Sequence, residues 1–107
     1  MQTYNTQIGT DIAVAANELR QGACVGIPTE TVYGLAANAL NPAAVVQIFD
    51  IKKRPSFDPL IVHIPDISSV LTYATEFPAP LKALAERFWP GPLTILLPKR
   101  ENIPDLV

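Results

Sequence analysis

Residues 28–36 read PTETVYGLA, and they place hydroxyl, carboxyl and phenol groups directly after an apolar run over residues 23–27. In open α/β sheets, ligands bind in the crevice beyond the carboxyl ends of the strands. Pro28 removes a backbone donor where the predicted strand ends, and Gly34 permits a bend or a close approach. The stretch therefore predicts a ligand site. The alternative is a polar strand-to-helix loop whose threonines only hydrogen-bond backbone amides.

A run of three cations, Lys52-Lys53-Arg54, stands before Pro55 at the end of a predicted helix. If the run leaves the helix in an extended conformation, Lys52 and Arg54 project to the same side. An ammonium and a guanidinium on one side suit a phosphate or carboxylate ligand. The alternative is that these cations only complement the helix dipole.

His63 lies in the apolar run over residues 60–64, on the opposite face from its aliphatic neighbours. A lone histidine in an apolar strand is more often a core residue than a catalyst. It has no ligand partners at zinc spacing, and the chain has neither of the familiar glycine-rich phosphate loops. The single Cys24 excludes an internal disulfide framework and favours a reducing compartment, where it serves as a small buried hydrophobe.

Composition predicts one folded domain over residues 1–107, since 49% of the residues are hydrophobic and 17% are charged. The net charge of −2 argues against a nucleic-acid footprint over the whole chain. No apolar run approaches the roughly 18 residues that cross a bilayer, so no membrane partner is expected.

Predicted helices alternate with predicted strands. Because of this alternation we expect an α/β domain with a mainly parallel or mixed sheet. The helices are expected over residues 11–21, from the Asn41-Pro42 pair to before Pro55, after Asp66, and from Pro80 to residue 88; the strands are expected over residues 23–27, 60–64 and 93–97.

Four ordered motifs in this sequence closely resemble the YrdC-like family of threonylcarbamoyl-AMP (L-threonylcarbamoyladenylate) synthases. The motifs are PTETVYGL at residues 28–35, KKRP at 52–55, PLIVH at 59–63 and WPGPLT at 89–94. The resemblance implies an open twisted mixed sheet flanked by helices. The family's later Arg-x-Pro strand and Ser-Ala-Asn segment have no counterpart here. We therefore expect the N-terminal portion of a longer domain, incomplete as a synthase when alone.

The resemblance implies a nucleotidyltransferase that makes threonylcarbamoyl-AMP from L-threonine, bicarbonate or CO2, and ATP, with release of pyrophosphate. The product would serve the threonylcarbamoyl modification of tRNA in the cytoplasm. Such chemistry needs two anions held together and their charge neutralised, without a covalent enzyme intermediate. This requirement agrees with the lack of a catalytic triad in the sequence.

Residue roles also follow from the resemblance. Lys52 and Arg54 would be the catalytic pair that binds the ATP phosphates. Thr31 and His63 would contact L-threonine, and Tyr33 would help to wall the same site. Asp58 matches a nucleotide contact, although a carboxylate beside phosphates is repulsive unless magnesium or a ribose hydroxyl intervenes. Magnesium is expected with ATP, and no protein ligand for it is evident in the sequence.

Two alternatives stay open at this point. The same fold has been associated with double-stranded RNA, so an RNA-binding module with RNA or tRNA contact is one, although the net acidity disfavours strong binding. The other is the related domain of hydrogenase-maturation carbamoyltransferases, which handles carbamoyl-adenylate. The partners expected from the first interpretation are L-threonine, bicarbonate or CO2, ATP, and downstream tRNA-modification proteins.

Overall fold

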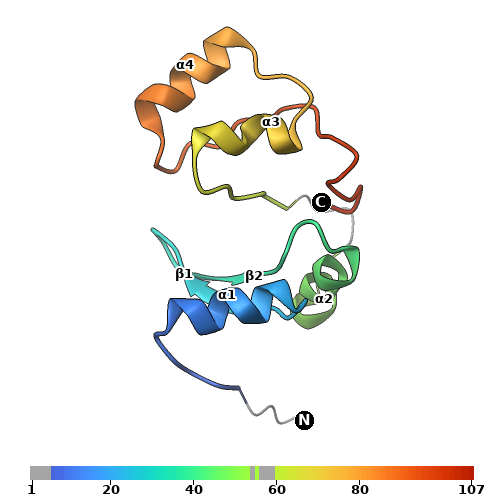
Figure 1. Ribbon diagram of the computed structural model, residues 1–107. Helices are drawn as coiled ribbons and strands as arrows, with labels where there is room; N and C mark the ends of the chain where they lie inside the picture. The colour runs from blue at the N-terminus through green and yellow to red at the C-terminus, as the bar shows by residue number, and fades with distance from the viewer. Residues whose placement is uncertain (1–5, 54, 56–59) are drawn as a thin grey trace.

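The computed structural model describes residues 6–53, 55 and 60–107, which form two regions (Figure 1). The N-terminal region (residues 6–53) holds α1 (Ile12–Arg20), β1 (Val25–Pro28), β2 (Tyr33–Ala36) and α2 (Pro42–Lys52). The C-terminal region (residues 60–107) holds the 3-10 turn η1 (Ile67–Ser69), α3 (Val70–Tyr73) and α4 (Ala79–Phe88). The molecule is elongated, 50 × 29 × 23 Å, with a radius of gyration of 15.2 Å, where about 13 Å is typical of a compact chain of 100 residues.

Both long helices of the N-terminal region begin at the side chains that the sequence predicts. Asp11 accepts hydrogen bonds from the first amides of α1, and Asn41 does the same for α2, ahead of Pro42. Gly22 follows α1 with φ at +93°, a conformation that favours glycine after a helix. These local signals explain why the predicted bounds of the two helices agree closely with the structure.

The hydroxyl-rich stretch is a hairpin tip, so a strand follows it and not the helix that the alternative interpretation supposed. β1 and β2 pair antiparallel, from Val25 opposite Ala36 to Pro28 opposite Tyr33. Four residues, 29–32, connect the strands, a loop length that suits a hairpin. The sequence did not indicate β2 because residues 33–36 hold no clear strand pattern of their own; the pairing with β1 defines this strand.

The core of the N-terminal region lies on one face of α2. Four of its side chains are buried: Ala44, Val45, Ile48 and Phe49. These four positions lie on one face of the helix, which is the face that packs inward. Cys24 is only half-buried, with its sulfur 3.8 Å from the carbonyl of Ala44, and this partial burial raises the pKa of the thiol.

The C-terminal region has helices where they were predicted but not the predicted strands. Residues 60–64 and 93–97 form no ladder in the described structure, so the expectation of strands there was wrong. Their side chains still alternate between half-buried and exposed positions. A strand needs a neighbour about 4.8 Å away to pair its amides and carbonyls. Alternation in the sequence predicts the face of a segment and not its partner.

Side chains also replace regular capping at α3. Asp66 precedes η1, but its carboxylate accepts from the hydroxyls of Ser68 and Ser69 and not from the helix amides that the sequence suggested. At the other end, Arg100 Nε donates to the carbonyl of Leu71 at 2.7 Å, and Asn102 donates to that of Thr72 at 3.0 Å. Carbonyls at a helix end lack partners within the helix. The tail therefore caps α3.

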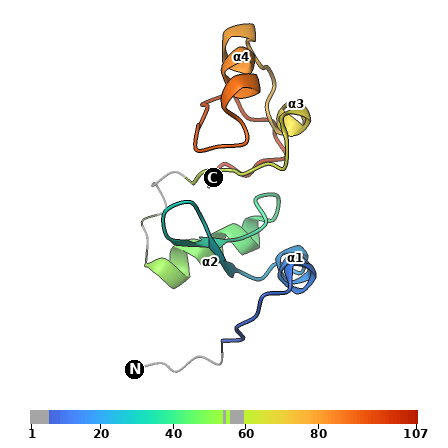
Figure 2. The same ribbon diagram turned by 90° about the vertical axis from the view of Figure 1, so that its left-hand side faces the viewer.

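The C-terminal core is small. It consists of Val70, Ala74, Ala85 and Ile103, which come from α3, α4 and the tail. The C-terminus lies between the two regions in both Figure 1 and Figure 2, two views that differ by a turn of 90°. The mixture of helices and a sheet agrees with the predicted α/β class. The sheet of the described residues is a two-stranded antiparallel one, and not the mainly parallel or mixed sheet that was expected. Among the described residues, no helix is long and apolar enough to cross a membrane.

Candidate functional site

The tip of the β1–β2 hairpin is organised around the hydroxyl of Thr29. Its oxygen accepts from the amide of Val32 at 3.2 Å and from that of Thr31 at 3.4 Å, and its proton is donated to the carbonyl of Val32. A threonine that hydrogen-bonds to nearby backbone groups in this way supports a turn without Asn or Gly at its centre. Thr29 therefore has a structural role, as the alternative interpretation of this stretch supposed.

Thr31 and Tyr33 are both exposed at the same tip. The hydroxyl of Thr31 lies 3.5 Å from that of Thr29, at the limit of a hydrogen bond. Since the Thr29 proton is donated to Val32, Thr31 is the donor in that contact, and its oxygen can still accept a hydrogen bond from a ligand. Tyr33 begins β2 and is 78% exposed. Both residues are on the surface, as candidate ligand contacts must be.

Lys52 and Lys53, the described part of the cationic run, do not have the extended conformation that the sequence suggested. Lys52 is the last residue of α2, and Lys53 adopts the left-handed conformation with φ at 54°. Lys52 is still helical, and the helix ends after it because Lys53 is left-handed. Many helices end at a left-handed residue. The candidates Arg54 and Asp58 lie outside the described residues.

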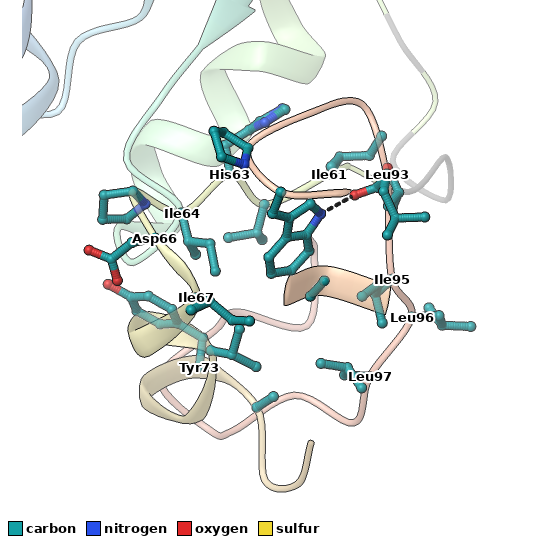
Figure 3. A pocket seen from close by; sticks show the side chains of 18 of the residues that line it. Ile61, His63, Ile64, Asp66, Ile67, Tyr73, Leu93, Ile95, Leu96 and Leu97 are labelled. Carbon is teal, nitrogen blue, oxygen red and sulfur yellow. Dashed lines mark hydrogen bonds between the residues drawn. The ribbon is translucent and has the colours of Figure 1, made fainter. Parts of the chain in front are cut away.

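An open cavity of about 1030 Å³ occupies the C-terminal region (Figure 3). Its walls come from the two runs predicted as strands, together with η1, α3, α4 and the tail. Aliphatic side chains such as Ile67, Ile95 and Leu97 line much of it. His63 is exposed and lies on the cavity wall near one edge.

Most charged groups on the cavity wall already have partners. The hydroxyl of Ser68 lowers the pKa of the Asp66 carboxyl. Lys99 lies 2.7 Å from Asp105 and donates to the carbonyl of Ile103 at 2.9 Å, and its hydrogen bond lowers the pKa of Asp105.

Two further groups on the wall are also paired. Glu86 pairs with Lys82 at 4.0 Å on the surface of α4. The indole of Trp89 donates to the carbonyl of Leu93 at 2.7 Å (Figure 3). The polar wall of the cavity is thus largely occupied by contacts within the chain.

Glu30 is the residue that sequence reasoning left without a role. It is exposed at the hairpin tip, and it is the one residue of the N-terminal region among the described residues that line the cavity. His63 is the one predicted site residue on the same wall; Thr31, Tyr33 and Lys52 do not line it. A glutamate between two threonines was visible in the sequence, but its place on the cavity wall that His63 also lines depends on how the two regions meet.

The arrangement suits the binding of a small polar molecule better than it suits metal or nucleophilic chemistry. The cavity wall carries the Glu30 carboxylate and the His63 imidazole, and the hydroxyls of Thr29 and Thr31 lie next to Glu30 at the hairpin tip. Among the described residues, no three His, Cys, Asp or Glu side chains gather to hold a metal ion. Cys24 lies away from this cavity, and its pKa is raised rather than lowered, which does not favour a thiolate.

Comparison with protein families finds one model that matches residues 17–107. It is the Sua5/YciO/YrdC model, described as telomere recombination. Among curated proteins, a threonylcarbamoyl-AMP synthase of Pyrococcus abyssi is 50% identical over 96 residues, 90% of this chain and 28% of that protein. One of Bacillus subtilis is 54% identical over 87 residues, 81% of this chain and 25% of that protein.

Solved structures agree with these matches. A crystal structure of P. abyssi Sua5 complexed with L-threonine superimposes with a TM-score of 0.84 at 50% identity, covering 87% of this chain and 27% of that one. The likeness confirms the predicted fold class. The chain spans about a quarter of the length of these relatives.

Proposed function

Because the chain belongs to the Sua5/YciO/YrdC family, we propose that it takes part in the synthesis of threonylcarbamoyl-AMP from L-threonine, bicarbonate or CO2, and ATP. The observation that carries the proposal is the likeness to a relative whose crystal structure holds L-threonine, at 50% identity over 87% of this chain. The reaction class is nucleotidyl transfer, and the product would serve tRNA modification.

The reaction has two steps, and neither needs an enzyme nucleophile. The neutral amine of threonine adds to CO2, forming an N–C bond and releasing a proton, which gives a carbamate. A carbamate oxygen then attacks the α-phosphorus of ATP, and the bond to the β-phosphate oxygen breaks, so that pyrophosphate leaves with its electron pair. The protein's contribution is to hold the two reactants in line and to balance their negative charge.

The hairpin tip and the cavity edge supply groups that suit the amino acid. In the proposed complex, Thr31 contacts the threonine through its hydroxyl oxygen, which can accept a hydrogen bond. His63 approaches from the cavity wall, and Tyr33 covers one side of the site. A site that hydrogen-bonds a substrate hydroxyl rejects the analogue lacking it by a wide margin.

The proposed phosphate ligands are Lys52 and Arg54, with Asp58 as a nucleotide contact. Lys52 is exposed at the end of α2, where a long flexible side chain can reach a bound polyphosphate. Magnesium would arrive with ATP; among the described residues no metal-binding cluster is present, so we assign it to the phosphates and no step depends on it. Cytoplasmic location, contact with tRNA and downstream tRNA-modification proteins as partners belong to the same proposal.

Release of pyrophosphate tests the function. The complete protein carrying this sequence is incubated with ATP and bicarbonate, and with either L-threonine or L-valine, which replaces the hydroxyl by a methyl group. We expect pyrophosphate only with threonine, because an unpaired polar site disfavours valine. Equal release with valine, or none with threonine, would contradict the proposal.

The phosphate role has its own test. Arg54→Ala removes one charge-assisted contact to ATP, which is worth about 1.5–3 kcal/mol. ATP affinity, measured by calorimetry on the complete protein, should fall by that amount, whereas Arg20→Ala, a cation in the last turn of α1, should leave it unchanged. Unchanged affinity in Arg54→Ala removes this residue from the proposed site.

A further inference from the structure

We infer that Glu30, at the tip of the β1–β2 hairpin, binds the ammonium group of the amino-acid substrate on the cavity wall that His63 also lines. The inference rests on the proposed function and adds a binding residue to it. Glu30 belongs to the N-terminal region, and it lines the cavity of the C-terminal region.

The hairpin tip holds Glu30 in place without using its side chain. Thr29 satisfies the amides of Thr31 and Val32 and donates to the carbonyl of Val32, so the backbone on either side of Glu30 is tied to one hydroxyl. The methyl group of Thr29 also approaches Gly34 of the opposite strand, at 3.7 Å from where a Cβ would lie. The loop is therefore ordered by its own contacts, and the Glu30 carboxylate can serve a ligand.

The other carboxylates on the cavity wall are engaged elsewhere. Asp66 accepts from the hydroxyls of Ser68 and Ser69, and Glu86 pairs with Lys82. Glu30 makes no hydrogen bond or ion pair with any residue in the described ranges 6–53, 55 and 60–107. It is thus the wall carboxylate most available to a cationic group.

An α-amino acid carries an ammonium and a carboxylate on the same carbon, so its site needs an acceptor and a donor facing one space. Glu30 supplies an acceptor with two oxygens, and the His63 imidazole supplies a donor. Lys99, the cation on this wall, is held by Asp105 and by the carbonyl of Ile103. The wall therefore carries an acceptor and a donor whose chemistry suits the two ends of a free amino acid.

The test separates the ammonium from the rest of the ligand. Ligand-observed NMR measures the binding of L-threonine and of (R)-3-hydroxybutanoate, which keeps the hydroxyl and carboxylate but lacks the amine. The proteins are the complete wild type, Glu30→Gln and the matched control Glu86→Gln, which neutralises another exposed carboxylate on the wall. Glutamine keeps the size of the side chain and removes its charge.

Glu30→Gln should weaken L-threonine binding by about 10- to 100-fold, the loss expected for a charge-assisted hydrogen bond. Its affinity for (R)-3-hydroxybutanoate should be unchanged, and Glu86→Gln should bind both ligands as the wild type does. Unchanged threonine binding in Glu30→Gln overturns the inference while the function stands. Equal weakening of both ligands also overturns it, because that result indicates a damaged hairpin tip. Wild-type protein that does not bind threonine contradicts the proposed function itself.

Discussion

Each of the two regions of this chain is stabilised internally by a different kind of interaction. In the N-terminal region, helices begin at side-chain caps, two strands pair through their backbones, and one face of α2 forms the core. In the C-terminal region, side chains bond to backbone carbonyls: Arg100 and Asn102 reach α3, and Trp89 reaches the carbonyl of Leu93. No described helix or strand of one region packs extensively against an element of the other.

The difference teaches where a binding site can form in such a chain. The region with regular pairing provides a firm hairpin tip, and the region with irregular walls provides an open cavity of about 1030 Å³. Glu30 is the described residue of the first region that lines the cavity of the second. Binding and stability can therefore be tested by changes that affect one region and spare the other.

The largest effect should come from the N-terminal core. Phe49 is 6% exposed, and Phe49→Ala removes a buried ring, at a cost of about 3–5 kcal/mol in the free energy of unfolding. Urea unfolding followed by far-UV circular dichroism measures this loss. The unfolding midpoint observed by the fluorescence of Trp89, the single tryptophan, should shift much less, because Trp89 reports on the C-terminal region. Phe88→Ala, at a ring 52% exposed, is the control and should cost far less. Equal shifts of both signals in Phe49→Ala would show that the two regions unfold as one.

The next effect concerns the tail of the C-terminal region. Arg100→Ala removes the donor to the carbonyl of Leu71 and leaves a helix-end carbonyl without its protein partner. Hydrogen bonds to charged groups are worth about 1.5–3 kcal/mol, and exposure to water places this one at the lower end. Here the unfolding midpoint from Trp89 fluorescence should fall, and circular dichroism of the N-terminal helices should change little. Arg87→Ala, an exposed cation on α4, is the matched control. A midpoint equal to the wild type would contradict the capping role of the tail.

A smaller effect is expected at the hairpin tip. Thr29→Val keeps the methyl contact beside Gly34 but removes the hydroxyl that binds Val32, at a net cost of about 0.5–1.5 kcal/mol. Thr29 is a positioning residue, so the KM for threonine should rise several-fold while kcat changes little. Thr29→Ser, which restores the hydroxyl, should recover the wild-type KM. If the serine variant behaves like the valine variant, the hydroxyl does not order the tip.

The smallest effect is a dependence of stability on pH. Lys99 lowers the pKa of the exposed Asp105 carboxyl below its unfolded value. A carboxyl group whose pKa is lower in the folded protein than in the unfolded protein stabilises the fold at pH values above its unfolded pKa. That stability is lost as the pH falls through its folded pKa. Stability should therefore decline slightly below about pH 4, the ordinary range for Asp. Asp105→Asn should remove that part of the acid dependence, and an identical pH profile in the variant would show that the pair does not contribute.

The helices could be predicted from the sequence because their signals are local. Asp11, Asn41 and Pro42 mark the helix starts wherever the rest of the chain lies. The strand patterns predicted faces correctly, but residues 60–64 and 93–97 form no ladder, because pairing depends on a partner that no local pattern specifies. The pairing of residues 33–36 with β1 was missed for the same reason.

The candidate site was predictable only in part. The exposure of Thr31, Tyr33 and His63 agrees with their predicted roles, and those roles stay predictions. The predicted extended conformation was wrong for Lys52 and Lys53, because Lys52 belongs to α2 and Lys53 is left-handed. Glu30 and His63 line the same cavity although they are more than 30 positions apart in the sequence. A local motif cannot predict such a placement, because it depends on how the two regions pack.

The central claim, that this chain belongs to an enzyme that joins threonine, bicarbonate and ATP, is tested most directly by isotope transfer. The complete protein is supplied with ATP, L-threonine and ¹³C-bicarbonate, and the adenylate formed is analysed by mass spectrometry. We predict a threonine-containing adenylate that is heavier than the unlabelled product by the one labelled carbon, together with pyrophosphate. An adenylate without the label, or label incorporated in the absence of threonine, would contradict the account.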